Sequence, residues 1–259
     1  MSFVDVKNIS IHFGGLKAVD EVSFSIPKGS LYGLIGPNGA GKTTVFNILS
    51  GFYCADHGKV VFDNTDITNK KADETNLAGI ARTFQNIRLF KNLSVLENVV
   101  IACQQKEMRK FKNPWLHSIF NTKKYQQFEK QLKTEALELL KIFKLDTQAY
   151  EKASSLPYGS QRKLEIVRAL ATKPKLLMLD EPAAGMNPVE KNELNQLIRF
   201  IKEKFNLTIL LIEHDMKVVM PLCDRITVLH QGKKIAEGTS AEIKNSEVVI
   251  EAYLGKRHV

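Results

Sequence analysis

A glycine-rich segment at residues 36–43, GPNGAGKT, has the residue types and spacing that bind nucleotide phosphates. Its glycines let the backbone N–H groups turn inward toward phosphate oxygens, and the N-terminus of a following helix favours negative charge. Lys42 can reach the β- and γ-phosphates, and the Thr43 hydroxyl can ligate Mg²⁺. The apolar stretch before the segment and the amphipathic stretch after it predict a strand and a helix, which favour nucleoside triphosphate binding over a simple tight turn. The candidate phosphate-binding residues are Gly36, Pro37, Asn38, Gly39, Ala40, Gly41, Lys42, Thr43 and Thr44.

Two acidic residues, Asp180 and Glu181, follow a second apolar stretch at 176–179. A buried strand that ends in this way places carboxylates at the carboxyl edge of a sheet, where ligands bind in α/β folds. Asp180 would hold Mg²⁺ through a water, and Glu181 would orient and polarise an attacking water. Standing alone, such a pair would more often be a solvated acidic turn. The complete phosphate loop upstream favours the catalytic interpretation.

The elements that position these residues change in character along the chain. The first third contains short strand candidates, a polar and basic stretch at about 94–145 has helical spacing, and the chain then alternates helix and strand. Apolar strands alternating with helices predict a mainly parallel sheet covered on both faces. The predicted strands are 4–9, 22–26, 31–35, 60–63, 176–179 and 207–212, the predicted helices about 160–171 and 188–204, and a hairpin at 226–229 and 233–236 precedes a short helical tail.

The composition is that of an ordinary globular protein. The chain has 259 residues, 44% hydrophobic and 25% charged, which excludes a disordered tail, a collagen-like fibre and a small disulfide scaffold. Its three widely spaced cysteines favour reduced thiols in a cytosolic compartment over disulfides or a zinc site. The longest apolar stretches fall short of the roughly 18 to 20 residues of a membrane span. The first ten residues lack the pattern of a secretion signal, so we expect neither a spanning segment nor secretion.

The segment at 156–170, LPYGSQRKLEIVRAL, resembles the signature segment of ATP-binding-cassette (ABC) ATPases. Other motifs stand in that family's order: the phosphate loop, Gln85 in RTFQ, the acidic strand end, and His214 in IEHD. The resemblance covers nearly the whole chain. Within the family it is closest to the larger ATP-binding subunit of branched-chain amino acid importers, through the segments 13–19, 81–90, 93–99, 157–159 and 181–188.

This resemblance implies an α/β fold with a P-loop NTPase (RecA-like) core. The core would hold a mainly parallel sheet, accompanied by an antiparallel β subdomain and an inserted helical subdomain. A single ABC ATPase domain would span residues 1–259, with 1–92 and 155–259 as the nucleotide-binding core, 93–154 as the helical subdomain and 238–259 as a short C-terminal helical tail. The implied reaction is hydrolysis of ATP to ADP and phosphate, with Mg²⁺.

The roles of the family's residues are assigned to this chain only where the motifs match. Phe13 matches the aromatic residue that stacks on adenine, Gln85 a ligand of Mg²⁺ that senses the γ-phosphate, and His214 the switch histidine that supports Glu181. Gly159 and Ser160 begin the signature helix, which in the family caps the γ-phosphate of ATP bound to the opposite subunit. Taken singly, each would more often be an ordinary core, turn or cap residue. The implied catalytic residues are Glu181, His214 and Lys42, and the implied metal ligands are Thr43, Gln85 and Asp180.

The signature departs from the family's Leu-Ser-Gly-Gly-Gln. Pro157 stands at its Ser, Tyr158 at its first Gly and Ser160 at its Gln, so only the Gly159 backbone contact and the helix dipole carry over. Asn187 also stands where the family commonly has Asp. We therefore expect the ATP site that this signature helix completes to bind ATP but to hydrolyse it more slowly. Mixed dimers carrying Glu181→Gln in one subunit at a time test this, and equal loss from both would contradict it.

The net charge of +9 is concentrated in one stretch, residues 106–133, with a local balance of +6. Interspersed aromatic residues would also suit single-stranded nucleic acid, and a solvated helical face is the plainer alternative. We expect this basic insert to face the membrane or a permease, because anionic lipids favour Lys and Arg by about 1 kcal/mol each. Its charged residues are Lys106, Glu107, Arg109, Lys110, Lys112, Lys123, Lys124, Glu129, Lys130 and Lys133, and its aromatic residues Trp115, Phe120, Tyr125 and Phe128.

The implied partners are a second ABC ATPase subunit in a homo- or heterodimer and two membrane permease subunits. A periplasmic or extracellular solute-binding protein would act indirectly, and the chain would lie peripherally on the cytoplasmic face of the bacterial inner membrane. Alternatives are a soluble ABC ATPase acting on nucleic acid or ribosomes, an importer subunit for urea or amides, and a non-catalytic scaffold. We expect no nucleic acid partner, because the chain has one cassette and an insert too short for a long coiled coil.

Overall fold

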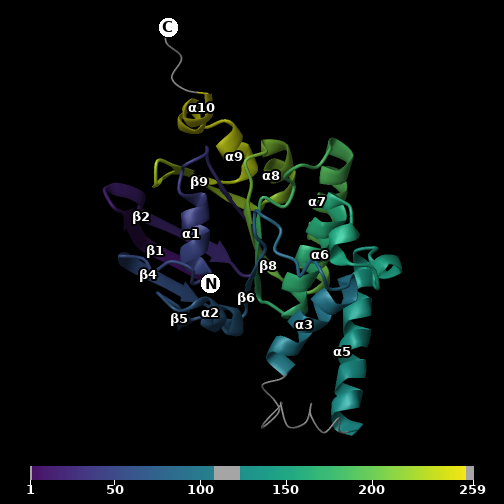
Figure 1. Cartoon of the computed structure of the whole chain (residues 1–259). Coiled ribbons are helices and arrows are strands. Elements are labelled where there is room, and N and C mark those ends of the chain that lie inside the picture. The colour runs from purple at the N-terminus through teal and green to yellow at the C-terminus, as the bar shows by residue number, and fades with distance from the viewer. Residues whose placement is uncertain (1, 108–122, 255–259) are drawn as a thin grey trace. The chain divides into compact units, whose positions relative to one another are not determined.

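The computed structural model describes residues 2–107 and 123–254 (Figure 1). Contacts divide the chain into two compact units, the first formed by residues 1–82 and 175–259 and the second by residues 83–174. The predicted helical subdomain, 93–154, falls within the second unit.

The first unit contains both sheets. Its elements are β1 (Ser2–Phe13), β2 (Leu16–Pro27), β3 (Leu31–Ile35), α1 (Lys42–Leu49), β4 (His57–Phe62), β5 (Thr65–Asp66), α2 (Ala72–Ala78), β6 (Ile80–Arg82), β7 (Leu176–Asp180), α7 (Pro188–Lys204), β8 (Thr208–Ile212), α8 (Met216–Leu222), β9 (Arg225–His230), β10 (Lys233–Gly238), α9 (Ser240–Lys244) and α10 (Glu247–Leu254). The second unit contains α3 (Val95–Glu107), α5 (Lys123–Ile142), the 3₁₀ turns η2 (Asp146–Gln148) and η3 (Ala153–Ser155), and α6 (Tyr158–Ala171).

The larger sheet has the strand order β10-β9-β3-β8-β7-β6. All neighbours in it are parallel except β10, which pairs antiparallel with β9. Every residue of β3, β7 and β8 is buried, as continuous apolar runs require when helices cover both faces. The predicted mainly parallel sheet is therefore confirmed, together with the α/β fold class.

The second sheet is antiparallel, in the order β2-β1-β4-β5. Its strands β1 and β2 each span 12 residues and are longer than the predicted segments 4–9 and 22–26. The register of β1 against β2 shifts between Val6 and Ile9 and again near Ile11. Such bulges interrupt the alternation of buried and exposed residues, so the alternating pattern revealed only part of each strand.

Helix α1 lies between the two sheets (Figure 1). Its Val45, Phe46, Ile48 and Leu49 belong to one buried cluster with apolar side chains from both sheets. Burying each large apolar side chain stabilises the fold by roughly 1.5–3 kcal/mol. Because α1 begins at the phosphate loop, this packing also fixes that loop. Helix α8 covers the opposite face of β3, where a Cβ on Gly33 would come within 3.1 Å of the Cys223 sulfur.

Several short elements, among them α2, β6 and α8, were not predicted from the sequence. Helix α2 and strand β6 are seven and three residues long, too short to display a periodic apolar pattern. Helix α8 also contains Pro221, a residue that normally indicates the end of a helix.

The second unit is helical. In α5, Phe128, Leu132, Ala136, Leu139 and Leu140 are all buried, which confirms the helical spacing. Of the basic insert, Lys130 and Lys133 are exposed on α5. The remaining lysines and arginine of the insert, with Glu107, Trp115 and Phe120, have side chains outside the described residues. In the described part of the chain, no helix combines the length and apolar character of a membrane span.

Helix α7 begins with a complete capping box. The Asn187 side chain accepts hydrogen bonds from the backbone N–H groups of Val189 at 2.9 Å and Glu190 at 3.0 Å. The Glu190 carboxylate accepts one from the Asn187 N–H at 2.8 Å. Asn187, which departs from the family's Asp, therefore satisfies orphan donors at this helix start.

We predict that Asn187→Ala lowers the free energy of unfolding by about 1 kcal/mol, because two N–H groups lose their acceptor. That change corresponds to a decrease of about 2–4 °C in the melting temperature. Asn187→Asp should leave stability nearly unchanged, since Asp caps as well as Asn. Thermal unfolding followed by circular dichroism measures both, and equal destabilisation by Ala and Asp would contradict the capping role.

Candidate functional site

The carboxyl ends of three adjacent strands form one edge of the larger sheet. The phosphate loop follows β3, residues 213–214 follow β8, and Glu181 follows β7. The Glu181 N–H donates to the Ile212 carbonyl at 2.9 Å, so the pairing of β7 and β8 extends to the acidic residue itself. The sheet thus brings together the residues that the sequence placed in separate segments.

Two positions of the phosphate loop require glycine, because backbone carbonyl oxygens of other segments lie very close to them. A Cβ on Gly36 would lie 2.2 Å from the Leu229 carbonyl oxygen, and one on Gly41 would lie 2.6 Å from that of Ala18. Gly41, at φ 98°, is the N-cap of α1. Its left-handed backbone is open to glycine without strain. The loop therefore reaches the start of α1, whose first N–H groups have no helical acceptor and can bind phosphate.

Lys42 is almost fully buried, with 6% of its surface exposed. Its ammonium donates to the carbonyl oxygens of Gly36 at 2.7 Å and Pro37 at 3.0 Å. Burial lowers the pKa of Lys42, and the charges of Glu181 and Asp180 oppose that decrease. The lysine and both predicted carboxylates therefore share one electrostatic environment.

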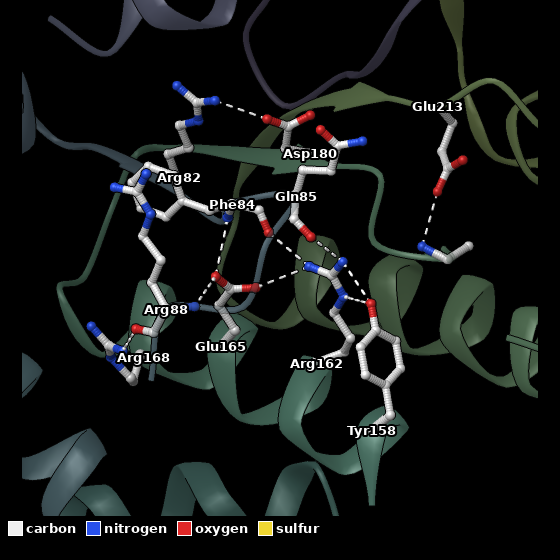
Figure 2. A network of polar contacts seen from close by, with 11 residues as sticks. Arg82, Phe84, Gln85, Arg88, Tyr158, Arg162, Glu165, Arg168, Asp180 and Glu213 are labelled. Carbon is white, nitrogen blue, oxygen red and sulfur yellow. Dashed lines mark hydrogen bonds and ion pairs between the residues drawn. The ribbon is translucent and has the colours of Figure 1, made fainter. Parts of the chain in front are cut away.

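Asp180 is buried and forms an ion pair with Arg82, whose Nη2 lies 2.8 Å from the Asp180 Oδ2 (Figure 2). The other terminal nitrogen of Arg82 donates to the side chains of Asn47 at 2.6 Å and Ser50 at 3.1 Å. The guanidinium carbon also lies 5.6 Å from the centre of the Phe46 ring. Arg82 therefore connects Asp180 to α1, a role that its place in the RTFQ motif did not reveal.

Glu181 and His214 are brought together as predicted. Their closest atoms, the Glu181 Oε1 and the His214 Nδ1, are 3.4 Å apart. The Glu181 side chain is 14% exposed and that of His214 54% exposed. Glu181 has a left-handed backbone, φ 46°, which costs a non-glycine residue about 1–2 kcal/mol. This strained conformation places the carboxylate at the sheet edge, where reactive residues often sit.

Glu213 is a buried acid to which sequence reasoning assigned no role. Its Oε1 accepts a hydrogen bond from the Ala183 N–H at 2.9 Å, which ties the end of β8 to the turn after Glu181 (Figure 2). Burial raises the pKa of Glu213, and the Ala183 N–H and the His214 charge oppose the rise. An apolar strand ending in two polar residues was the only sequence signal for it.

The predicted adenine-stacking residue, Phe13, ends strand β1 with 45% of its surface exposed. It makes an edge contact with the Tyr53 ring, at 5.2 Å between ring centres and 66° between planes. An exposed ring held by a second aromatic residue can stack on a purine. Its role in binding adenine stays a prediction.

Gln85, Gly159 and Ser160 belong to the second unit. Gln85 is exposed, and its backbone carbonyl accepts a hydrogen bond from Arg162 (Figure 2). Helix α6 begins at Tyr158, two residues before the predicted start, so Gly159 and Ser160 lie in its first turn. Pro157, the N-cap residue, makes no side-chain cap, and the first N–H groups of the helix can therefore bind an anion.

Two oxygen donors of the first unit fit Mg²⁺. Thr43 is exposed in the first turn of α1 and offers a hydroxyl oxygen, and Asp180 offers a carboxylate. Hard oxygen ligands of this kind, few in number and completed by phosphates, suit Mg²⁺. Among the described residues, no group of three or more His, Cys, Asp or Glu could hold a metal by itself.

The raised pKa of Glu213 predicts a pH dependence of stability. The folded protein holds this proton more tightly than the unfolded chain, whose ordinary pKa is 4.5. As the pH rises from 4.5 through the raised pKa, the wild type should therefore lose stability relative to Glu213→Gln, by about 1.4 kcal/mol for every pH unit that separates the two pKa values. Gln keeps an acceptor for the Ala183 N–H. Urea unfolding from pH 4 to 8 measures the difference, with exposed Glu203→Gln as control, and a constant difference would contradict the raised pKa.

Comparison with known proteins places the chain in a family. A model described as ABC transporter matches residues 19–184, and one described as branched-chain amino acid ATP-binding cassette transporter matches residues 233–259. The chain is 41% identical to the high-affinity branched-chain amino acid transport ATP-binding protein BraF of Pseudomonas aeruginosa, over 98% of both chains. It is 43% identical to the corresponding protein LivG of Salmonella typhimurium, over 97% of both chains.

Similarity to solved structures indicates the same family. The ADP conformation of an ATP-binding cassette of an ABC transporter has a TM-score of 0.84 and 37% identity, covering 99% of this chain and all of that one. A dimeric cassette in a post-hydrolysis state bound to ADP and phosphate has a TM-score of 0.75 and 26% identity, over 92% and 98% of the two chains. The chain belongs to the ABC transporter family, as one of its ATP-binding cassettes.

Proposed function

We propose that this chain is the ATP-hydrolysing subunit of an importer for branched-chain amino acids. The observation that carries the catalytic part is the placement of Glu181 beside His214, at 3.4 Å, with Lys42 at the start of α1 close enough for the Glu181 charge to act on it. The similarity to BraF and LivG over nearly the whole chain supports the solute class, as does the match at residues 233–259. The proximity of Glu181 and His214 supports a catalytic cassette over a scaffold.

Under this proposal each candidate site residue has a defined task. The N-terminus of α1 and Lys42 bind the phosphates, and Phe13 stacks on the adenine. Glu181 accepts a hydrogen bond from the attacking water and orients it toward the γ-phosphate, and His214 holds Glu181 and reaches the same phosphate. Thr43, Gln85 and Asp180 would hold Mg²⁺, which neutralises charge on the phosphates when bound.

The start of α6 serves a second ATP site. Gly159 and Ser160 lie in its first turn, and we infer that their N–H groups cap the γ-phosphate of ATP held by a partner cassette. ATP would then be enclosed between two subunits, so hydrolysis would require a dimer. The implied assembly contains a second ABC ATPase subunit and two membrane permeases, with the cassette peripheral on the cytoplasmic face. A solute-binding protein outside the membrane would act through the permeases.

Glu181→Gln tests the catalytic assignment. It keeps the size of the side chain but removes the carboxylate, so the turnover rate should decrease by about 10²–10⁴-fold. The dissociation constant for ATP should change little, because the phosphate loop is intact. Steady-state ATPase assays and nucleotide-binding titrations measure the two quantities. Glu203→Gln, on the exposed face of α7, is the matched control.

The solute assignment is tested in cells in which Glu181→Gln replaces the native chain. Uptake of labelled leucine, isoleucine and valine should be lost, whereas urea and amide uptake should be unchanged. If uptake of all three amino acids stayed normal while the purified variant assembly had no ATPase activity, the solute class would be rejected. The assignment as an ATPase would remain intact. A loss confined to urea or an amide would identify that solute instead.

A further inference from the structure

The segment that carries Gln85, residues 84–90, has no helix or strand of its own. Side chains from the second unit hold its backbone instead. Glu165 accepts hydrogen bonds from the N–H groups of Phe84 at 3.1 Å and Arg88 at 3.4 Å. Arg162 donates to the carbonyls of Phe84, at 2.7 Å, and Gln85. These hydrogen bonds satisfy backbone groups that no helix or strand pairs.

Two of these side chains are buried charges on α6. Arg162 is 2% exposed and Glu165 5% exposed, and they form an ion pair at 3.3 Å, three residues apart on one face of the helix. Burial raises the pKa of Glu165, and the Phe84 N–H, the Arg162 charge and the Arg88 N–H oppose it. Each charge therefore depends on the other and on the backbone of residues 84–88 (Figure 2).

Tyr158, the first residue of α6, joins the same network. Its hydroxyl oxygen accepts hydrogen bonds from the Arg162 Nε at 3.2 Å and Nη2 at 2.9 Å. The same Nη2 also donates to the Gln85 carbonyl (Figure 2). One guanidinium thus connects the start of α6 directly to the backbone of Gln85. A glycine at position 158, as in the usual signature, would have no hydroxyl to make this contact.

We propose that Tyr158, Arg162 and Glu165 form a positioning relay that sets the orientation of Gln85 according to the position of the α6 N-terminus. This deepens the proposed function and rests on it, since there Gly159 contacts ATP of the partner cassette and Gln85 serves the chain's own ATP. When a phosphate engages the first turn of α6, Tyr158 shifts the Arg162 guanidinium, and the Gln85 carbonyl follows. The relay therefore links the two ATP sites of a dimer, and the tyrosine in the signature is the link.

Tyr158→Phe removes only the hydroxyl and leaves the ring. In the nucleotide-free full chain, hydrogen exchange of the peptide covering residues 84–90 should accelerate by about three- to tenfold, because Arg162 loses an acceptor and holds the segment less firmly. Tyr150→Phe, at an exposed tyrosine of the same unit, should leave this exchange unchanged. Equal exchange in wild type and Tyr158→Phe would overturn the relay.

A double-mutant cycle tests the functional step in the assembled ATPase. Tyr158→Phe should raise the Mg²⁺ concentration for half-maximal turnover by about three- to tenfold, with the affinity for Mg²⁺-free ATP unchanged. In a Gln85→Ala background the same substitution should have no further effect, since the relay acts only through Gln85. Arg162→Lys should resemble Tyr158→Phe, because lysine lacks the planar fork that contacts both oxygens.

The outcomes separate the relay from the function on which it rests. If Gln85→Ala leaves the Mg²⁺ dependence unchanged, the assignment of Gln85 in the proposed function fails. If Gln85→Ala changes it and Tyr158→Phe does not, only the relay fails. Additive effects of the two substitutions would also overturn the relay. A melting temperature of Tyr158→Phe within about 2 °C of the wild type ensures that none of these outcomes reflects unfolding.

Discussion

The parallel register of β3, β8 and β7 is the constraint on which the site depends. Leu34 pairs with Ile212, and Ile212 pairs with Asp180, so three residues from distant parts of the sequence form one row across the sheet. The residues that follow this row are the phosphate loop, Glu213 with His214, and Glu181. Because side chains alternate between the faces of a sheet, a slip of one residue in any strand would send its buried apolar side chains to the wrong face.

The same constraint explains how much of the site could be predicted from the sequence. The phosphate loop and the acidic strand end are contiguous segments, so their residue types and neighbours reveal both the element and the chemistry. Arg82 and Asp180 are 98 residues apart, and Phe84 and Glu165 are 81 apart. Partners at such distances leave no local pattern, so neither this ion pair nor this side-chain anchor could be deduced from spacing alone.

The length of β1 and the start of α6 were missed for a related reason. Bulges alter the burial pattern of β1 without altering its residue types, and Pro157-Tyr158-Gly159 contains two residues that are poor in helices. Arg162 contacts Tyr158 one turn away in the same helix, and it also makes long-range contacts with the carbonyls of residues 84 and 85. Tertiary structure overrides local preference at the residues that the function uses.

The two units hold their candidate site residues by different means. In the first, backbone ladders position Asp180 and Glu181, and such hydrogen bonds persist whatever the side chains are. In the second, the backbone around Gln85 depends on Glu165 and Arg162, so one substitution can change its placement. The backbone at the sheet edge is thus held by strand pairing, and the backbone of residues 84–88 by side chains of α6.

The contacts of Lys42 have a consequence for the entropy of phosphate binding. Its ammonium donates to the Gly36 and Pro37 carbonyls, and charged hydrogen bonds of this kind contribute roughly 1.5–3 kcal/mol each. A lysine ammonium has three N–H donors, so while two are directed to these carbonyls the third can donate to a phosphate oxygen. The carbonyls hold the ammonium in one position before a phosphate binds. Less side-chain freedom is then lost on binding, so the loop is preorganised for a phosphate.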